Sequence, residues 1–249
     1  MNIKLVIEYD GLNFNGWQKQ TNKLNIQGRI EKAIYDVTGK EVDLIGAGRT
    51  DSNVHAYAQV ANFHIDSDFP IEKYPVALNS KLKNKITIKS AEIADDEFHS
   101  RYNAKSRTYR YVINNSDTES AIKSNYEYFM YSKLDVDAMK EAIKHFEGQH
   151  DFTGFRSSGT SSKNSIREIY KAEIKEVIDE DDKRKRIYIE LKGSGFLYNM
   201  VRIIAGTILE VGLGKIDPKD IPDIIKSKDR QRAGDTLPAK GLFLLNVEY

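Results

Sequence analysis

The stretch IYKAEIKEVIDEDDKRKRIYIEL, residues 169–191, indicates the fold class of this chain most directly. Its two ends, 169–178 and 187–191, are rich in Ile, Val and Tyr, which is typical of β-strands. The charged run between them, 179–186, is predicted to be the solvated tip of a hairpin. A hairpin pairs its strands antiparallel, so it favours an α+β protein over one built on a parallel sheet.

The rest of the chain alternates between strand and helix patterns in the same way. Strands are expected over 3–9, 60–65, 86–93, 109–113 and 242–247, and helices over 26–37, 70–83, 136–146, 197–211 and from Pro218 onward. The first of these helices has Asn25 as a candidate N-cap and Gly39 as a candidate stop. We therefore predict an α+β fold with a largely antiparallel sheet in two similar α/β halves, 1–105 and 106–249.

The composition excludes several kinds of protein. The chain has no cysteine, which excludes disulfides, zinc–thiolate sites and thiol catalysis. The N-terminus lacks a signal-peptide layout, and the most apolar stretch, 200–208, is too short to span a bilayer. We therefore expect a cytoplasmic protein with no membrane partner. Because the net charge is only +1, a surface that binds nucleic acid would have to concentrate positive charge locally.

The segment GAGRTDSNVHA, residues 46–56, is the strongest candidate for a catalytic site. Its glycines let the backbone take unusual angles and let a ligand approach closely. On an extended chain Arg49 and Asp51 would share one face, where the guanidinium would keep the carboxylate ionised, as covalent catalysis by aspartate requires. The competing interpretation is a polar loop with a surface ion pair. A metal site that adds His55 and His64 is not favoured, because the sequence lacks metal-ligand spacing.

A second cluster, FHSRYNAKSRTYRY at residues 98–111, mixes basic and aromatic residues and contains no acid. Cations neutralise phosphates, and aromatic rings stack on unpaired bases. On a strand, Arg107, Tyr109 and Tyr111 would share one face, and Arg110 would lie on the other. The cluster thus predicts a sheet face that contacts RNA. The alternative is an edge strand whose Lys and Arg residues discourage aggregation.

Arg202 lies within the apolar helix predicted over 197–211. A helix that is apolar nearly all round is mostly buried, so a cation on it needs a partner or an opening onto a cleft. A phosphate, or a carboxylate such as Asp51, would serve. Alternatively, the arginine extends to solvent from a less buried side of the helix.

Six motifs, in order along the chain, resemble those of a known family. They are Tyr9-Asp10-Gly11 with Gly16-Trp17-Gln18; Gly48-Arg49-Thr50-Asp51 with Val54-His55-Ala56; Phe98-His99-Ser100-Arg101 with residues 107–111; Phe146-Glu147-Gly148 with His150-Asp151-Phe152 and Phe155-Arg156; residues 195–202; and Pro238-Ala239-Lys240-Gly241-Leu242. On these motifs the sequence resembles the tRNA pseudouridine synthase A family along essentially its whole length. Six ordered motifs are far more specific than any one of them.

The resemblance implies a fold, a reaction and a partner. The fold would be two α/β halves sharing a central, largely antiparallel sheet with a basic active-site cleft. The reaction cleaves the bond from ribose to N1 of uracil, turns the freed base and rejoins it through C5. Family members act as homodimers on uridines of the tRNA anticodon arm, at positions 38 to 40, and use neither a metal nor an organic cofactor.

The resemblance also implies roles for individual residues. Asp51 corresponds to the catalytic aspartate that forms a covalent adduct with the uridine, Arg49 to an arginine paired with it, and Tyr109 to an active-site tyrosine. Whether the aspartate attacks the base at C6 or assists at the sugar is left open by the sequence. Contacts to the RNA substrate are expected from Tyr109, His55, Arg101, Arg107, Arg110 and Arg202.

One position departs from the family pattern. Asn53 stands where glycine is usual, two residues after the aspartate. Asn tolerates positive φ better than other non-glycine residues, so we expect the turn to survive. Two other functions remain open: a non-catalytic tRNA-binding or folding module on the same scaffold, and a metal-dependent nuclease that uses Asp51 and His55.

Overall fold

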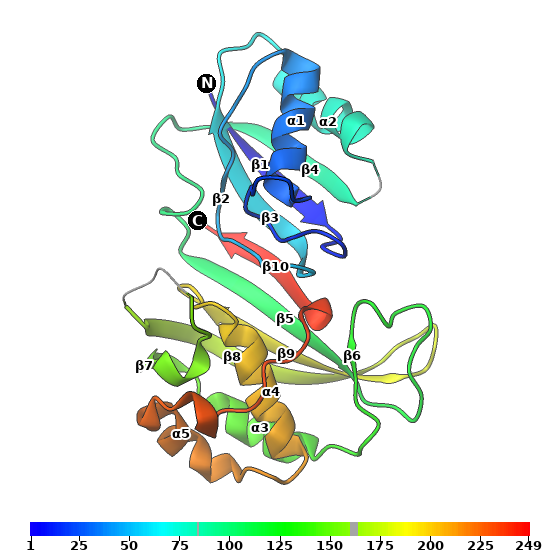
Figure 1. The fold of residues 1–249 in the computed structure, drawn as a ribbon, viewed down its shortest axis with the longest axis vertical. Coiled ribbons are helices and arrows are strands. Elements are labelled where there is room, and N and C mark those ends of the chain that lie inside the picture. The colour runs from blue at the N-terminus through cyan, green and yellow to red at the C-terminus, as the bar shows by residue number, and fades with distance from the viewer. Residues whose placement is uncertain (84, 160–163) are drawn as a thin grey trace. The chain divides into compact units, whose positions relative to one another are not determined.

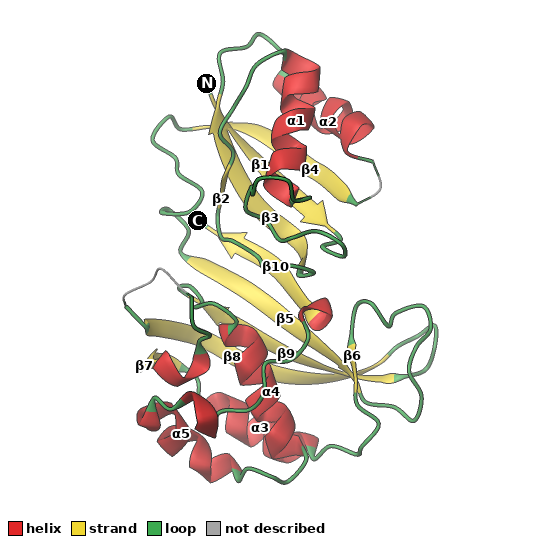
Figure 2. Cartoon of the chain, viewed as in Figure 1, coloured by secondary structure: helices red, strands yellow, loops and turns green. Residues whose placement is uncertain are grey.

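A computed structural model describes residues 1–83, 85–159 and 164–249 (Figure 1). These residues form two compact units. The first comprises residues 1–105 and 243–249, and the second comprises residues 106–242. The segment 243–249 thus lies in the first unit, whereas the division made from the sequence placed it in the second half. Each unit combines helices with a mainly antiparallel sheet, so the predicted α+β class is confirmed (Figure 2).

The sheet of the first unit is built on a long central strand. Its strands are β1 (Asn2–Tyr9), β2 (Ile45–Gly46), β3 (His55–His64), β4 (Ile86–Ala94) and β10 (Leu242–Glu248). β1 pairs antiparallel with both β3 and β4. β10 runs parallel to β3, and β2 pairs with β3 antiparallel. Ile3, Leu5 and Ile7 are fully buried, as the period of two along a strand requires for a face that meets the core.

Two helices of the first unit, α1 (Ile26–Thr38) and α2 (Tyr74–Leu82), lie on one side of this sheet (Figure 1). A 3-10 turn (Ile71–Lys73) precedes α2. The Asn25 side chain caps α1 by accepting a hydrogen bond from Gly28 N at 2.8 Å. The helix ends where Gly39 takes a φ of 70°. Both ends of this helix were predicted from the sequence, and both predictions are confirmed.

The second unit contains the predicted hairpin. Its strands are β5 (Ser106–Asn114), β6 (Tyr128–Phe129), β7 (Gly148–Asp151), β8 (Ile166–Ile178) and β9 (Lys185–Gly193). The order β5-β9-β8-β7 is antiparallel throughout, and β6 adds a short parallel pairing to β5. β8 and β9 are joined by residues 179–184 and pair antiparallel, with Ile174 opposite Ile189 in the core, so the hairpin is confirmed.

The helices of the second unit are α3 (Val136–Lys144), α4 (Met200–Gly212) and α5 (Ile221–Ser227). Short 3-10 turns occur at Thr153–Phe155, Pro218–Asp220, Arg230–Arg232 and Ala239–Gly241. The helix predicted over 197–211 begins only at Met200, because Asn199 takes a left-handed φ of 62°. Across the described residues, every helix is too short or too polar to cross a lipid bilayer.

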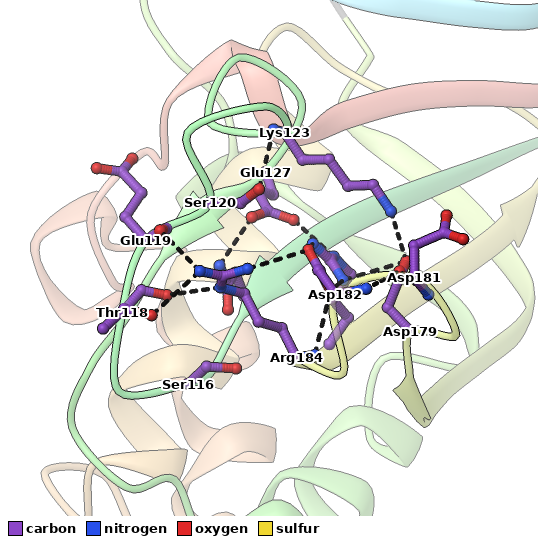
Figure 3. Close-up of polar contacts among 12 residues, drawn as sticks. Ser116, Thr118, Glu119, Ser120, Lys123, Glu127, Asp179, Asp181, Asp182 and Arg184 are labelled. Atoms are coloured by element: carbon purple, nitrogen blue, oxygen red, sulfur yellow. Dashed lines mark hydrogen bonds and ion pairs between the residues drawn. The ribbon is translucent and has the colours of Figure 1, made fainter.

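The hairpin tip, residues 179–184, is only in part the solvated turn that the sequence predicted, because Glu180, Asp181 and Lys183 are exposed but the other three residues are half-buried. It is joined to the preceding segment 116–127 by polar contacts (Figure 3). Arg184 donates hydrogen bonds to the carbonyl oxygens of Thr118, at 3.1 Å, and Glu119, at 3.3 Å. The ammonium of Lys123 lies 2.6 Å from a carboxylate oxygen of Asp179.

Arg186, the second residue of β9, is the centre of these contacts and is only 2% exposed. Its Nε lies 2.6 Å from Oε2 of Glu127, which is itself buried, and its Nη2 lies 2.8 Å from Oδ2 of Asp182. A buried guanidinium requires charged partners of this kind, since an unpaired buried charge is costly. Asp179 and Asp182 of the charged run therefore turn toward Arg186, which a pattern of charges along the sequence does not reveal.

Candidate active site

The Asp51 loop, residues 47–54, connects β2 to β3 in the first unit. Its start is held on β3, because Ala47 N donates to Val60 O at 2.7 Å and the Gln59 side chain donates to Gly48 O at 2.9 Å. Its end is closed by a turn in which Val54 N donates to Asp51 O at 3.2 Å. The half-buried Asp51 thus sits at the start of a short turn that leads straight into a central strand.

A second loop, the Trp17 loop of residues 10–24, packs against the Asp51 loop. Trp17 N donates to Thr50 O at 3.0 Å, and the Ser52 hydroxyl donates to Phe14 O at 2.8 Å. Gly16 takes a φ of +82°, and a Cβ there would stand 2.7 Å from Thr50 O. Only glycine permits both the positive φ and this close approach of two backbones.

The tryptophan itself is a buried support for the Asp51 loop. Trp17 is 2% exposed, and its indole lies so close to Gly46 that a Cβ at Gly46 would come within 2.6 Å of the ring. Gly46 ends β2, immediately before the Asp51 loop. The glycines around Asp51 therefore serve packing against Trp17 as well as backbone freedom.

Tyr9 holds the residue next to Asp51. The hydroxyl groups of Tyr9 and Thr50 lie 2.7 Å apart, and the two residues are 3% and 6% exposed. The ring of Tyr9 is also near that of Trp17, with 6.1 Å between centroids. We did not identify Tyr9 or Thr50 as site residues from the sequence, because a contact between residues 41 apart leaves no local signal.

Arg49 does not form the expected pair with Asp51. Its side chain is exposed, and no ion pair or hydrogen bond joins it to Asp51 in the part of the chain that the structure describes. The expectation rested on an extended chain, in which alternate residues share a face. Residues 47–54 instead form bends and a turn, so that periodicity does not apply.

Asn53 takes the positive φ that the sequence suggested for its position. Its φ is 63°, in the left-handed region. Its side chain is used as well, since Oδ1 accepts a hydrogen bond from Asn13 N at 3.1 Å. The turn thus survives the replacement of the usual glycine, and Asn53 adds a contact to the Trp17 loop that glycine could not make.

His55, expected among the RNA contacts, is 2% exposed. Its Nδ1 accepts a hydrogen bond from Gly11 N at 3.1 Å, and its ring stacks on Phe243 with 4.8 Å between centroids. The same nitrogen lies 3.1 Å from Oδ1 of Asp10. A residue this deeply buried supports the turn at residues 10–11, and it does not present a surface to RNA in this structure.

Asp10, beside His55, is held in its charged form. Partial burial acts to raise the pKa of Asp10, but a hydrogen bond from Leu12 N at 3.0 Å and the Lys85 ammonium at 3.1 Å outweigh it. The pKa of this carboxyl therefore lies below its ordinary value. A charged Asp10 fixes the Trp17 loop where it leaves β1.

Arg101 is exposed on the loop that follows β4. Its guanidinium carbon lies 5.6 Å from the ring centroid of Tyr102, which is 75% exposed. The loop is anchored by Ser100, whose N donates to the Asn62 side chain at 2.9 Å. Exposed acids at residues 95–97 precede it, so the local positive charge is smaller than the basic cluster alone suggested.

The remaining candidate residues lie in the second unit, where the predicted aromatic face of β5 is buried. Tyr109 is 8% exposed and meets Phe196 edge to face, with 5.2 Å between centroids. Tyr111 is fully buried, and its hydroxyl donates to Pro238 O at 2.8 Å. Burial raises the pKa of Tyr111, although the nearby Arg202 acts to lower it. The rings of this strand are therefore mainly core.

The arginines of β5 differ in their surroundings. Arg110 forms an ion pair with Glu190, opposite it on β9, and its guanidinium lies 4.4 Å from the ring centroid of Tyr188. Arg107 donates to Ser194 O at 3.0 Å. As predicted, Arg107 and Arg110 point to opposite faces, which follows from the alternation along a strand. Arg110 thus has a structural contact that the sequence did not indicate.

Arg202, in the first turn of α4, has neutral partners. It donates from Nε to Leu237 O at 2.6 Å and from Nη1 to Asn199 Oδ1 at 2.7 Å. Among the described residues no carboxylate forms an ion pair with it. The need for a partner inferred from the sequence is met, but by a carbonyl and an amide that leave the positive charge uncompensated.

Within residues 1–83, 85–159 and 164–249, no three His, Asp or Glu side chains are arranged to hold a metal ion. His55, which a metal-dependent nuclease would need at its centre, is instead committed to Gly11 and Phe243.

Comparison with known proteins identifies the family. A family model described as tRNA pseudouridine synthase matches residues 5–103 and 142–249. This chain belongs to the tRNA pseudouridine synthase family. Asp51, at the centre of the Asp51 loop, and Arg202 lie inside the matched segments of the family model, whereas Tyr109 lies between them.

Full-length bacterial relatives support this assignment. The tRNA pseudouridine synthase A of Acetivibrio thermocellus is 50% identical over 248 residues, which cover 100% of this chain and 99% of the relative. The protein of the same name from Clostridium acetobutylicum is 48% identical with the same coverage. A protein from Clostridium perfringens named tRNA pseudouridine synthase A 2 is 45% identical, again over 100% of this chain and 99% of the relative.

Proposed function

We propose that this chain isomerises uridine to pseudouridine in tRNA and that Asp51 is its catalytic carboxylate. The observation that carries this proposal is the placement of Asp51 in a fixed turn. Its neighbours Thr50 and Ser52 are tied to Tyr9 and to the Trp17 loop. A reactive group held by such supporting contacts needs little reorganisation when substrate binds. The membership of the tRNA pseudouridine synthase family supports the same function.

The chemistry requires one bond to break and another to form. The bond between ribose C1′ and uracil N1 breaks, a bond between C1′ and C5 forms, the C5 proton leaves and N1 gains a proton. Asp51 supplies the nucleophile for the covalent adduct, at C6 of the base or at the ribose, and the bond to Asp51 breaks again before the product leaves. The target base must first leave its stack, which costs a few kcal/mol and calls for contacts to the displaced base and its phosphates.

We assign these contacts to residues expected from the family. Tyr109 is proposed to contact the target base. Arg101 and Arg107 are proposed to neutralise phosphates, and Arg202 supplies positive charge that no described carboxylate pairs with. Arg49, expected as the partner of Asp51, is proposed to bind a phosphate instead, because it is exposed. His55 and Arg110 are weaker candidates, since His55 is 2% exposed and the charge of Arg110 is paired with Glu190. The substrate is proposed to be the anticodon arm, at positions 38 to 40, bound by a homodimer in the cytoplasm.

Tritium release tests the activity. tRNA transcribed with C5-tritiated uridine is incubated with the wild-type protein and with Asp51→Ala, and tritium released to water is measured over time. The proposal expects release by the wild type only, with pseudouridine appearing at positions 38 to 40 when the tRNA is sequenced by base-specific chemistry. Release no faster than from Asp51→Ala would sink the enzymatic proposal.

The same experiment separates the other functions. A non-catalytic tRNA-binding or folding module would bind tRNA without releasing tritium. A metal-dependent nuclease would shorten the tRNA when magnesium is added, which denaturing gels would detect. Pseudouridine found at uridines other than 38 to 40 would support the proposed reaction and contradict only the proposed target positions.

A further inference from the structure

We infer that Tyr9 is a positioning residue for the proposed reaction, because its hydroxyl holds Thr50 and thereby fixes Asp51. This inference rests on the proposed function of Asp51. Tyr9 is 3% exposed, and the inferred role acts through Thr50 and needs no contact between Tyr9 and the target base. Its hydroxyl instead lies 2.7 Å from the hydroxyl of Thr50, which is covalently adjacent to Asp51.

The anchor of this contact is rigid. Tyr9 is the last residue of β1 and pairs with Ala56 of β3 and with Ile86 of β4, so strands lie on both sides of it. Its ring is further confined beside that of Trp17. A group held on a central strand places its hydrogen-bond partner more accurately than one held on a loop.

Thr50 is held through both its side chain and its backbone. The side chain meets Tyr9, and the carbonyl oxygen accepts a hydrogen bond from Trp17 N at 3.0 Å. The backbone contact survives most substitutions, whereas the side-chain contact depends on the two hydroxyl groups. Thr50 is 6% exposed, so water cannot readily replace a missing hydroxyl. Loss of either hydroxyl is thus expected to let the turn at Asp51 shift.

A small displacement of a catalytic group has a large effect on rate. A misplacement of about 1 Å can cost about a hundredfold, because the reacting atoms must meet at near-contact distance. The affinity for tRNA, in contrast, depends on phosphate and base contacts that do not pass through Tyr9. We therefore expect Tyr9→Phe to lower the single-turnover rate constant by roughly 10- to 100-fold and to change the dissociation constant for tRNA less than about twofold.

Two substitutions at Thr50 test the same contact from the other side. Thr50→Val removes the hydroxyl but keeps the shape, and we expect it to reproduce the loss of rate seen in Tyr9→Phe. Thr50→Ser keeps the hydroxyl and is expected to retain most of the rate. Because both changes remove one interaction, the double variant Tyr9→Phe with Thr50→Val should be little slower than either single variant.

The chain offers a matched control. Tyr74 in α2 is also a fully buried tyrosine of the first unit, remote in sequence from the Asp51 loop. Tyr74→Phe removes the same hydroxyl group from a buried ring and is expected to leave the single-turnover rate unchanged. The thermal unfolding midpoint of each variant is measured alongside, so that rates are compared only between folded proteins.

The outcomes distinguish this inference from the proposed function. If the wild type releases tritium but Tyr9→Phe and Thr50→Val stay within twofold of it, positioning by Tyr9 is wrong and the function stands. The inference is equally overturned if the fold decrease in rate of the double variant equals the product of the fold decreases of the two single variants. It is also overturned if the affinity for tRNA falls as much as the rate. If the wild type releases no tritium, the proposed function fails, and positioning for it fails with it.

Discussion

The Asp51 loop and the hairpin tip both carry acids beside arginines, and they are held in place by different kinds of contact. The Asp51 loop is fixed by neutral hydrogen bonds to Tyr9, Phe14 and Trp17, while its own Arg49 is exposed. The hairpin tip is fixed by ion pairs to the buried Arg186. In the Asp51 loop these contacts are made by Thr50 and Ser52, the neighbours of the carboxylate, whereas in the hairpin tip the carboxylates themselves make the contacts.

This difference has a physical reason. A buried guanidinium is tolerated only when carboxylates compensate it, so Glu127, Asp179 and Asp182 are drawn to Arg186. Thr50 and Ser52 need only one hydrogen-bond partner each, which a phenol or a carbonyl supplies. The comparison therefore predicts that substitutions in the two loops will separate activity from stability.

The largest effect is expected from an isosteric change in the Asp51 loop. Asp51→Asn should lower turnover by more than about a thousandfold, because an amide cannot serve as the nucleophile. The thermal midpoint and tRNA affinity should remain close to those of the wild type. Tritium release and a tRNA-binding assay measure the two properties. A variant that loses affinity as strongly as turnover would indicate a binding role for Asp51.

The second effect is on stability and concerns the other loop. Arg186→Met removes the charge that compensates three acids, and we expect unfolding of the second unit to become easier by about 3–5 kcal/mol. Urea unfolding followed by far-UV circular dichroism measures this change. Trp17, the single tryptophan, lies in the first unit, so its fluorescence reports on that unit separately.

The control for this variant is the exposed arginine of the Asp51 loop. Arg49→Met should change stability by less than about 0.5 kcal/mol, because no described residue forms an ion pair with Arg49. Equal destabilisation by Arg49→Met and Arg186→Met would contradict the claim that only the hairpin tip is stabilised by ion pairs to its arginine.

The third effect is a dependence of stability on pH. Hydrogen bonds from Arg186 lower the pKa of Asp182, and the hydrogen bond from Lys123 lowers that of Asp179. The folded pKa values thus lie below that of an unfolded aspartate, about 3.9. The stability these groups supply is present at neutral pH and is lost as the pH falls through about 4 toward the folded values.

Asp182→Asn tests this sign directly. The variant should be less stable than the wild type at pH 7, and its free energy of unfolding should fall less steeply below about pH 4. Urea unfolding at a series of pH values measures both slopes. Parallel curves for the two proteins would show that Asp182 is not coupled to folding in this way.

The smallest effect concerns the backbone of the Asp51 loop. Asn53 has a φ of 63°, so Asn53→Ala should destabilise the protein by about 1 kcal/mol, since a Cβ without a polar side chain is disfavoured there. Asn53→Gly, which restores the usual family residue, should lie within about 0.5 kcal/mol of the wild type and keep its turnover. Thermal unfolding and tritium release measure these differences. A slow Asn53→Gly variant would show that the contact of Asn53 with Asn13 matters for catalysis.

Local patterns predicted much of the fold. The helix at Asn25 and Gly39 and the hairpin of β8 and β9 depend on capping and strand-forming residues close together in the chain, and both are present. The positive φ of Asn53 was likewise predictable from residue type. The start of α4 was not, because the left-handed φ of Asn199 ends a mainly apolar run that reads as one continuous helix.

The candidate site was predictable only where its signal is contiguous. Asp51 could be predicted as the catalytic residue because its motif is continuous in sequence. The residues that contact its loop could not be predicted, since Tyr9 and Trp17 are more than 30 positions away from Thr50 in the sequence. The basic and aromatic cluster at 98–111 was misleading in part, because it does not show that Tyr111 is buried or that Arg110 faces Glu190.

By itself the sequence determined the family and the α+β class and led to the prediction of Asp51 as the reactive carboxylate, because these depend on residue types and their order along the chain. Only the tertiary structure decided which charges are buried and which contacts hold each loop. Arg49 and Arg186 each have acids within a few positions of the chain, yet Arg49 is exposed and Arg186 is buried. Burial depends on what the rest of the chain packs around a residue, and that is set by contacts between segments far apart in sequence.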